Sequence, residues 1–134
     1  MYYPIRADKH LSGLRVVVKD SIDVVGAKTS GSSKDYAELY GVCNMSAPAV
    51  QKLLYLGAVI VGKIGMSQFA DDQDPTGDFI DFHAPRSPRG DGNCVAGGSS
   101  FGFGAAAGAY KWLGFSVGKD SEPKAIPFTK RDFR

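Results

Sequence analysis

The chain has 134 residues, a length typical of one modest domain. Hydrophobic residues make up 43% of it, which is enough for a packed core and excludes general disorder. The formal net charge is only +2, so the charge balance indicates neither nucleic acid nor an acidic membrane surface as a partner. Residues 119–134, with five basic and three acidic side chains, account for all of this excess.

Cys43 and Cys94 are the only cysteines, and they form no close motif. The first residues show no basic region followed by an apolar run, and no apolar stretch approaches the length of a membrane span. We therefore expect free thiols in a reducing compartment and a cytoplasmic protein. No cluster of Cys, His and carboxylate residues has metal-ligand spacing, so we expect no metal or other cofactor, and His10 and His83 are predicted to be surface or loop histidines.

The first half of the chain alternates strand and helix patterns. Residues 14–19 form a β-branched run that predicts a buried strand, with Lys19 at its end. A second extended piece is predicted at 22–25 and a short helix at 34–40.

A stronger helix is predicted from Ser46, as the N-cap, to Gly57, with Pro48 in its first turn. The apolar run 59–61 follows at once as a buried strand. Strand, helix and strand in this order predict parallel pairing, with helices on the faces of the sheet.

The second half of the chain is less regular. A short helical turn is predicted at 67–70, and residues 71–98 are rich in Asp, Pro and Gly, which predicts a long loop that packs down or lines a site. An Ala- and Gly-rich helix is predicted at 102–110 and another strand at 115–117. The pattern stops after Gly118.

Ser99 and Ser100 lie within a run of small residues, GGSSFGFGAAAG, at 97–108. Glycines let other groups approach the main chain, so the pair could form a site where hydroxyls and backbone meet a ligand. A Gly/Ser loop leading into a tightly packed small-residue helix explains the same composition.

Three chemical motifs fit this region poorly. Residues 98–102 satisfy G-x-S-x-G, but an α/β-hydrolase with Ser100 as nucleophile needs a strand directly before it and a histidine after it, and both histidines precede it. The glycines of 102–108 have the wrong spacing for a dinucleotide fingerprint, and those of 114–119 have the wrong spacing for a phosphate-binding loop.

Lys19 and the two serines remain as chemical candidates. A lysine acts as a general base only when it is neutral, and burial beside a packed sheet favours the neutral form. An ordinary lysine that ends a strand fits the sequence equally well, and the spacing does not decide between them.

Several spaced motifs resemble the amidase signature hydrolases, especially their fungal branch. These motifs are LSGLRVVVKDSIDVVG at 11–26, the helix and strand pattern at 47–63, APRSPRGDG at 84–92, and the Gly/Ser stretch from 97 to 121. The resemblance implies an α/β fold: a partial amidase-signature core, with a mixed β-sheet and flanking helices, that is incomplete in this chain. It implies that residues 1–121 are the N-terminal part of an amidase signature domain, and it leaves 122–134 as a divergent tail that we expect to be disordered.

The same resemblance implies a catalytic unit made of a lysine, a serine held by a cis peptide bond and a nucleophilic serine. Lys19 matches the lysine, which acts as base and then acid, and Ser99 matches the cis-serine, which relays the proton. The implied substrates are small-molecule carboxamides, cleaved through an acyl-enzyme. Phe101 replaces a glycine of the signature.

The nucleophile position is where this sequence departs from the family. It holds Lys124, and the two preceding glycines are replaced by Glu122 and Pro123. Ser121, three positions earlier, is a poor substitute. Those glycines supply N–H groups to the oxyanion hole, whereas proline has no N–H.

Two classes of function follow from these observations. The first is an amidase-type hydrolase of carbon–nitrogen bonds that is expected to be inactive in this truncated form. The second is a non-catalytic pseudoenzyme fragment or a small binding or regulatory protein. The abrupt end of the resemblance after Ser121 favours a truncated or frameshifted product. Such a product is expected to associate with itself through its uncovered core.

Overall fold

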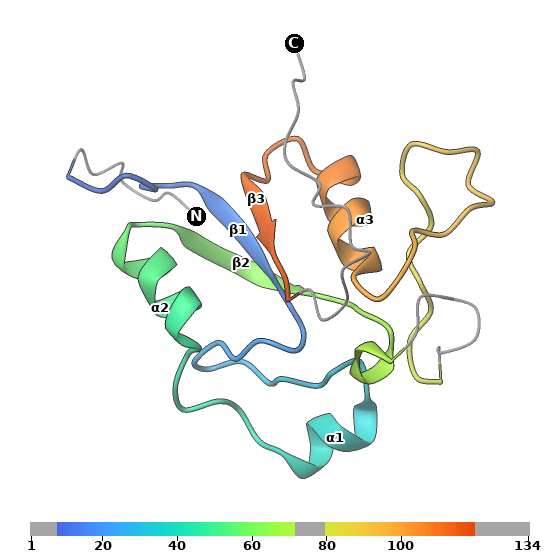
Figure 1. Ribbon diagram of the computed structural model, residues 1–134, viewed down its shortest axis with the longest axis horizontal. Helices are drawn as coiled ribbons and strands as arrows, with labels where there is room; N and C mark the ends of the chain where they lie inside the picture. The colour runs from blue at the N-terminus through green and yellow to red at the C-terminus, as the bar shows by residue number, and fades with distance from the viewer. Residues whose placement is uncertain (1–7, 72–79, 120–134) are drawn as a thin grey trace.

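The computed structural model describes residues 8–71 and 80–119 and shows a small parallel sheet with flanking helices (Figure 1). In chain order the elements are β1 (Arg15–Lys19), α1 (Lys34–Leu39), α2 (Pro48–Tyr55), β2 (Val59–Ile64), the 3₁₀ turn η1 (Gln68–Ala70), α3 (Phe101–Ala109) and β3 (Phe115–Val117). The predicted α/β class with flanking helices is confirmed.

The sheet has the order β2-β1-β3, and β1 pairs in parallel with both neighbours. Its central strand is the valine run: Val16 and Val18 are completely buried and Val17 is 7% exposed. A strand that is apolar on both faces is typical of the middle of a parallel sheet. Among the described residues, the antiparallel pairings are the isolated bridges Lys28–Val42 and Arg86–Val95.

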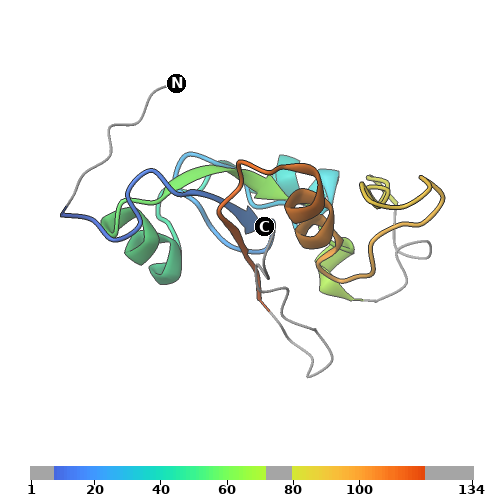
Figure 2. The same cartoon turned by 90° about the horizontal axis from the view of Figure 1, so that it is seen from above.

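Two helices lie next to the edge strands, α2 beside β2 and α3 beside β3 (Figures 1 and 2). The side chains of Val17, Ile64, Ala106 and Leu113 form a buried cluster, against which Phe103 packs. Ala106 and Phe103 belong to α3, so this helix covers the face of β1 that carries Val17. By the two-residue period of a strand, Lys19 points to the same face.

Small residues let α3 approach the end of β2 closely. A Cβ added to Gly102 would lie 2.6 Å from the carbonyl oxygen of Gly65. The Gly102 N–H donates to that same oxygen over 3.3 Å. The beginning of α3 is therefore fixed against the backbone that follows β2.

The extended piece predicted at 22–25 does not form a strand. Its two ends are tied by local bonds, in which Ile22 N–H donates to Lys19 O and Ala27 N–H donates to Val24 O. Between them the backbone bonds to a distant loop, since Asp23 O accepts the N–H of Ala47 at 3.0 Å.

The predicted N-cap of α2 is also wrong. The helix begins at Pro48 with Ala47 as its N-cap, and no side chain caps it. Ser46 Oγ instead accepts the N–H of Val25 at 2.8 Å, so this hydroxyl joins two loops rather than starting a helix. Gly57 ends the helix as predicted, with a φ of 94° that favours glycine.

The described part of the predicted long loop, residues 80–98, contains no helix or extended strand. Residues 72–79 of that loop and the predicted tail at 122–134 lie outside the described residues. His10 and His83 are exposed, and Cys43 and Cys94 are free thiols. No helix in the described ranges is long and apolar enough to cross a bilayer.

Candidate active site

Lys19 is a buried lysine at the carboxyl end of the central strand. Its side chain is only 1% exposed, and it is the largest fully buried side chain among the described residues. Lysine is almost never fully buried unless its nitrogen has partners. The contacts of that nitrogen therefore define the site.

Lys19 has two hydroxyl partners in the turn that precedes α3 and a carbonyl partner after β3. Lys19 Nζ donates to Ser99 Oγ at 3.1 Å, to Ser100 Oγ at 2.7 Å and to the carbonyl oxygen of Lys119 at 3.4 Å. The peptide bond between Gly98 and Ser99 is cis. The fold thus brings Lys19 to the Ser99 hydroxyl, 80 residues further along the chain.

An amine and two hydroxyls at these distances can exchange protons directly, because proton transfer requires a heavy-atom separation near 3 Å. A lone pair on a neutral Lys19 Nζ could accept a proton from either hydroxyl, and the resulting ammonium could return it. Lys19 and Ser99, which the family resemblance implies as base and relay, are therefore within hydrogen-bond distance of each other. The sequence did not predict a hydrogen bond from Lys19 to Ser100, whose hydroxyl oxygen lies nearer to the lysine nitrogen than that of Ser99.

A second polar group beside the lysine was not predicted. Asp20 forms an ion pair with Lys63, with 3.2 Å between Nζ and Oδ1, and both side chains are mostly buried. The sequence did contain a signal for it. Asp20 directly follows β1 and Lys63 lies near the end of β2, and the carboxyl ends of parallel strands meet at one edge of a sheet.

Asp23 lies in the turns after β1 and has a perturbed carboxyl group. Its Oδ1 accepts hydrogen bonds from Thr29 Oγ1 at 2.7 Å and from Cys43 Sγ at 3.3 Å. These two hydrogen bonds, with a smaller contribution from the charge of Lys63, hold the pKa of Asp23 below its ordinary value.

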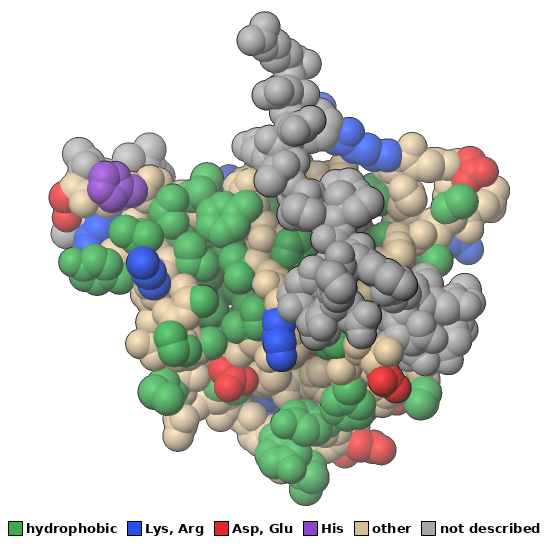
Figure 3. Space-filling view, viewed as in Figure 1, with side chains coloured by type: hydrophobic (Ala, Val, Ile, Leu, Met, Phe, Trp, Pro, Cys, Tyr) green, Lys and Arg blue, Asp and Glu red, His purple; other side chains and the backbone are tan. Residues whose placement is uncertain are grey.

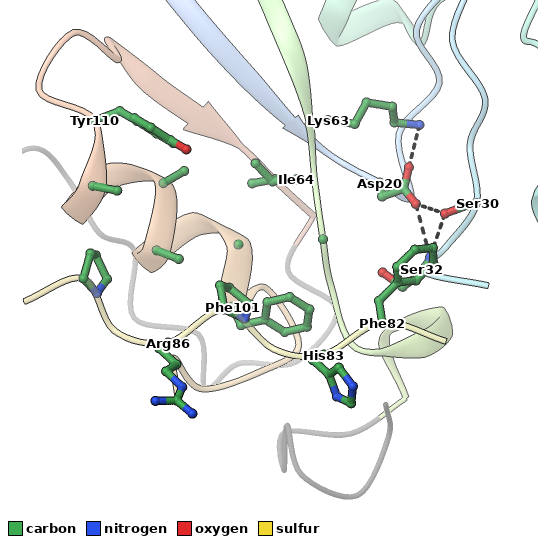
Figure 4. A pocket seen from close by; sticks show the side chains of 17 residues that line it. Asp20, Ser30, Ser32, Lys63, Ile64, Phe82, His83, Arg86, Phe101 and Tyr110 are labelled. Atoms are coloured by element: carbon green, nitrogen blue, oxygen red, sulfur yellow. Dashed lines mark hydrogen bonds and ion pairs between the residues drawn. The ribbon is translucent and has the colours of Figure 1, made fainter. Parts of the chain in front are cut away.

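A pocket of about 570 Å³ lies between the end of β2, α3 and the loop at 82–88. Figure 4 shows Asp20, Ser30 and Lys63 on one side of it and Tyr110 on the other, with Phe101 between them. Lys19, Ser99 and Ser100 are not among the residues that line it. The pocket and the lysine–serine cluster are therefore separate features. They are connected through the chain, because Asp20 and Phe101 line the pocket and directly follow Lys19 and Ser100 in the sequence.

Phe101, which stands where the family signature has a glycine, is buried against the backbone after β2. The side chain is 3% exposed, and its ring lies against Gly65, where an added Cβ would approach it to 3.0 Å. The predicted loss of the nucleophile concerns residues 121–124, which lie outside the described residues. They are Ser121, Glu122, Pro123 and Lys124.

A family model described as Amidase matches residues 3–121. The chain is 35% identical over 103 residues to a mandelamide hydrolase of Pseudomonas putida, covering 74% of this chain and 20% of that protein. It is 37% identical over 111 residues to a glutamyl-tRNA(Gln) amidotransferase subunit of Archaeoglobus fulgidus, covering 83% and 23%.

A solved structure of the corresponding subunit from Thermotoga maritima superposes with a TM-score of 0.67 at 30% identity, covering 80% of this chain and 23% of that one. A 6-aminohexanoate cyclic dimer hydrolase, at 24% identity and a TM-score of 0.62, shares the fold. The chain thus spans about a fifth of the length of the curated relatives it matches. Since the family model covers most of the sequence, from the strand with Lys19 through the Ser99 turn to β3, the chain belongs to the amidase family.

Proposed function

We propose that this chain carries the proton-transfer part of an amidase-type hydrolase, which acts on carbon–nitrogen bonds of small carboxamides. In this proposal Lys19 is the base and later the acid, and Ser99 is the relay. The observation that supports it is the buried Lys19 Nζ, which lies within hydrogen-bond distance of both serine hydroxyls.

The proposed chemistry begins with a neutral Lys19. Its nitrogen takes the proton of the Ser99 hydroxyl, and Ser99 takes one from the hydroxyl of a nucleophile. The nucleophile attacks the amide carbonyl carbon, and the carbon–nitrogen bond breaks as the proton returns along the same path to the leaving amine. Water then hydrolyses the acyl-enzyme by the same relay, which frees the acid.

The residues at the nucleophile position argue against turnover by the chain as it stands. Lys124 cannot act as the acyl-accepting hydroxyl, and Pro123 supplies no N–H to an oxyanion. One such donor contributes about 3 kcal/mol to stabilisation of the transition state. We therefore propose that the chain holds an amidase half-site and does not hydrolyse amides, as the alternative of a pseudoenzyme also implies.

We propose that the protein is cytoplasmic and that it associates with itself through exposed apolar surface. The free thiols of Cys43 and Cys94 are compatible with that compartment. The fungal branch of the family remains a prediction.

The test compares the purified chain with a triple variant, Glu122→Gly, Pro123→Gly and Lys124→Ser, which rebuilds the family pattern. We expect no release of ammonia from simple aryl amides by the unmodified chain. We expect the triple variant to react covalently with a fluorophosphonate probe at position 124. Both Lys19→Ala and Ser99→Ala in that background should reduce the labelling rate by at least about tenfold.

Turnover by the unmodified chain that Lys19→Ala and Ser99→Ala abolish would show that the half-site is a complete enzyme. Labelling of the triple variant at an undiminished rate without Lys19 would refute the base-and-relay assignment. A suitable control is Lys111→Ala, an exposed lysine outside the cluster, which should leave the labelling unchanged.

A further inference from the structure

We infer that Asp20 is a positioning residue, which fixes the distance between Lys19 and Ser99 without touching either reactive atom. The geometric part of this inference is independent of the enzyme chemistry. Its catalytic meaning rests on the proposed amidase function.

The Asp20 carboxylate connects β1, β2 and the loop between residues 28 and 32. Its Oδ2 accepts the hydroxyl of Ser30 and the N–H of Ser32, the latter at 3.2 Å. Its Oδ1 pairs with Lys63 Nζ, which also donates to Lys28 O at 3.0 Å and to Thr29 Oγ1 at 2.7 Å. Figure 4 shows this group at the edge of the pocket.

Most of the hydrogen-bonding capacity of this ion pair is used within the chain. The three N–H donors of Lys63 have three acceptors, and the Asp20 carboxylate, which can accept about four hydrogen bonds, has three donors. These partners come from different segments of the chain, so the pair holds those segments together.

Ser32 transmits the position of Asp20 towards the reactive serine. Ser32 is buried and has a φ of 62°, a left-handed conformation that is unusual for a residue other than glycine. Its N–H donates to Asp20 Oδ2 at 3.2 Å and to Ser30 Oγ at 3.1 Å, and its Oγ accepts the N–H of Met66 at 3.1 Å. The next residue, Ser67, donates its N–H to the carbonyl oxygen of Ser99 at 3.1 Å.

Asp20 also acts on the lysine directly, because the two residues are adjacent. The Asp20 N–H donates to Ile64 O at 3.0 Å, which continues the β1–β2 ladder beyond Lys19. Neighbouring side chains at a strand end point to opposite sides, so Lys19 reaches the serines while Asp20 reaches Lys63. Asp20 is thus linked to Lys19 through the peptide bond, and its carboxylate is linked to Ser99 through Ser32, Met66 and Ser67.

The test uses nuclear magnetic resonance on the unmodified chain and on Asp20→Asn, which keeps the shape of the side chain and removes its charge. We expect the exchange rate of the Ser67 amide with solvent to be at least about tenfold higher in the variant than in the unmodified chain. The exchange rates of the β1 amides should rise less. We also expect the side-chain resonances of Lys19 to shift, because its contacts to the hydroxyls change.

Val50→Ala is the matched control, since Val50 is completely buried in α2 and makes no hydrogen bond through its side chain. It should lower the melting temperature without selectively changing Ser67 exchange or the Lys19 resonances. If Asp20→Asn lowers the melting temperature in the same unselective way, the pair is only a stabilising contact and the inference is wrong.

A second variant keeps the test decisive if Asp20→Asn does not fold. Ser32→Gly accepts the positive φ but removes the acceptor of Met66 N–H, so exchange at Met66 and Ser67 should rise while the Asp20–Lys63 pair stays intact. Unchanged exchange at both amides would overturn the inference. Failure of the fluorophosphonate labelling would refute the amidase proposal alone, and the exchange results would still stand.

Discussion

At the scale of single residues, burial distinguishes Lys19 from the other described lysines. A lysine side chain loses its hydration when buried, so it stays buried only where other groups replace that water. Two serine hydroxyls and a backbone carbonyl take this place around Lys19 Nζ. The same contacts that make the burial possible also supply the proton path of the proposed chemistry.

Asp23 leads to a prediction on acid stability. Its pKa lies below the ordinary value of 3.8 in the folded chain, chiefly because Thr29 and Cys43 donate hydrogen bonds to it. A lowered folded pKa stabilises the fold above the unfolded value, and this contribution is lost as the pH falls through the folded pKa. We expect the melting temperature of the unmodified chain to fall more steeply below about pH 4 than that of Asp23→Asn.

The effect of Asp23 should be small, because the side chain is exposed to solvent. Thermal melts of both proteins at several pH values in the same buffer would measure it. Parallel pH profiles for the two proteins would show that these hydrogen bonds do not favour the charged carboxylate.

At the scale of elements, the glycines of α3 have different functions although they lie in one helix. Gly102 faces the backbone after β2, where an added Cβ would lie 2.6 Å from Gly65 O and 2.9 Å from Ile64 Cβ. Gly104 has open space, with its nearest neighbour, Ala96 Cβ, at 3.9 Å. The sequence alone shows the two as equivalent small residues.

Alanine substitutions at these two positions should therefore have opposite signs. We expect Gly102→Ala to lower the free energy of unfolding by about 1–3 kcal/mol, because backbone atoms cannot yield to the new methyl group. We expect Gly104→Ala to raise it by about 0.5–1 kcal/mol, because alanine is the better helix former.

Urea denaturation followed by circular dichroism would measure both changes. Gly104→Ala serves as the control for Gly102→Ala, since both add one methyl group to the same helix. If Gly102→Ala leaves the free energy of unfolding equal to or higher than that of Gly104→Ala, α3 does not lie against Gly65.

At the scale of the whole molecule, much apolar surface is exposed. Figure 3 shows apolar side chains over the region of α2 and the sheet and again near α1. Leu39 is 76% exposed, Tyr55 73% and Met45 67%. The chain covers 20% of the matched mandelamide hydrolase and 23% of the matched amidotransferase subunit structure.

We therefore expect the purified chain to associate with itself in a concentration-dependent way. Sedimentation velocity at several concentrations would measure this association. The double variant Leu39→Ser and Tyr55→Ser should weaken it, because both side chains are exposed and their loss removes no buried contact. A monodisperse monomer with a cooperative melt would contradict the expectation.

Elements with a strong local signal follow from the amino-acid sequence without reference to distant segments. The valine run marked β1 because β-branched residues fit a buried strand, and Pro48 and Gly57 marked the two ends of α2 through their backbone restrictions. The order of these patterns also predicted parallel pairing, which β1 and β2 confirm. The family motifs indicated the amidase family, which the match over residues 3–121 shows.

The contacts between distant groups, by contrast, depend on how the chain folds as a whole. The hydrogen bond from Val25 N–H to Ser46 Oγ joins two loops that pack against each other, and no local pattern specifies that packing. The link from Asp20 through Ser32 and Ser67 to Ser99 likewise joins segments that are remote in sequence. Hydrogen bonds between such segments form only once the parallel sheet has brought its strand ends to one edge, so their partners follow from the topology and not from the spacing of residues.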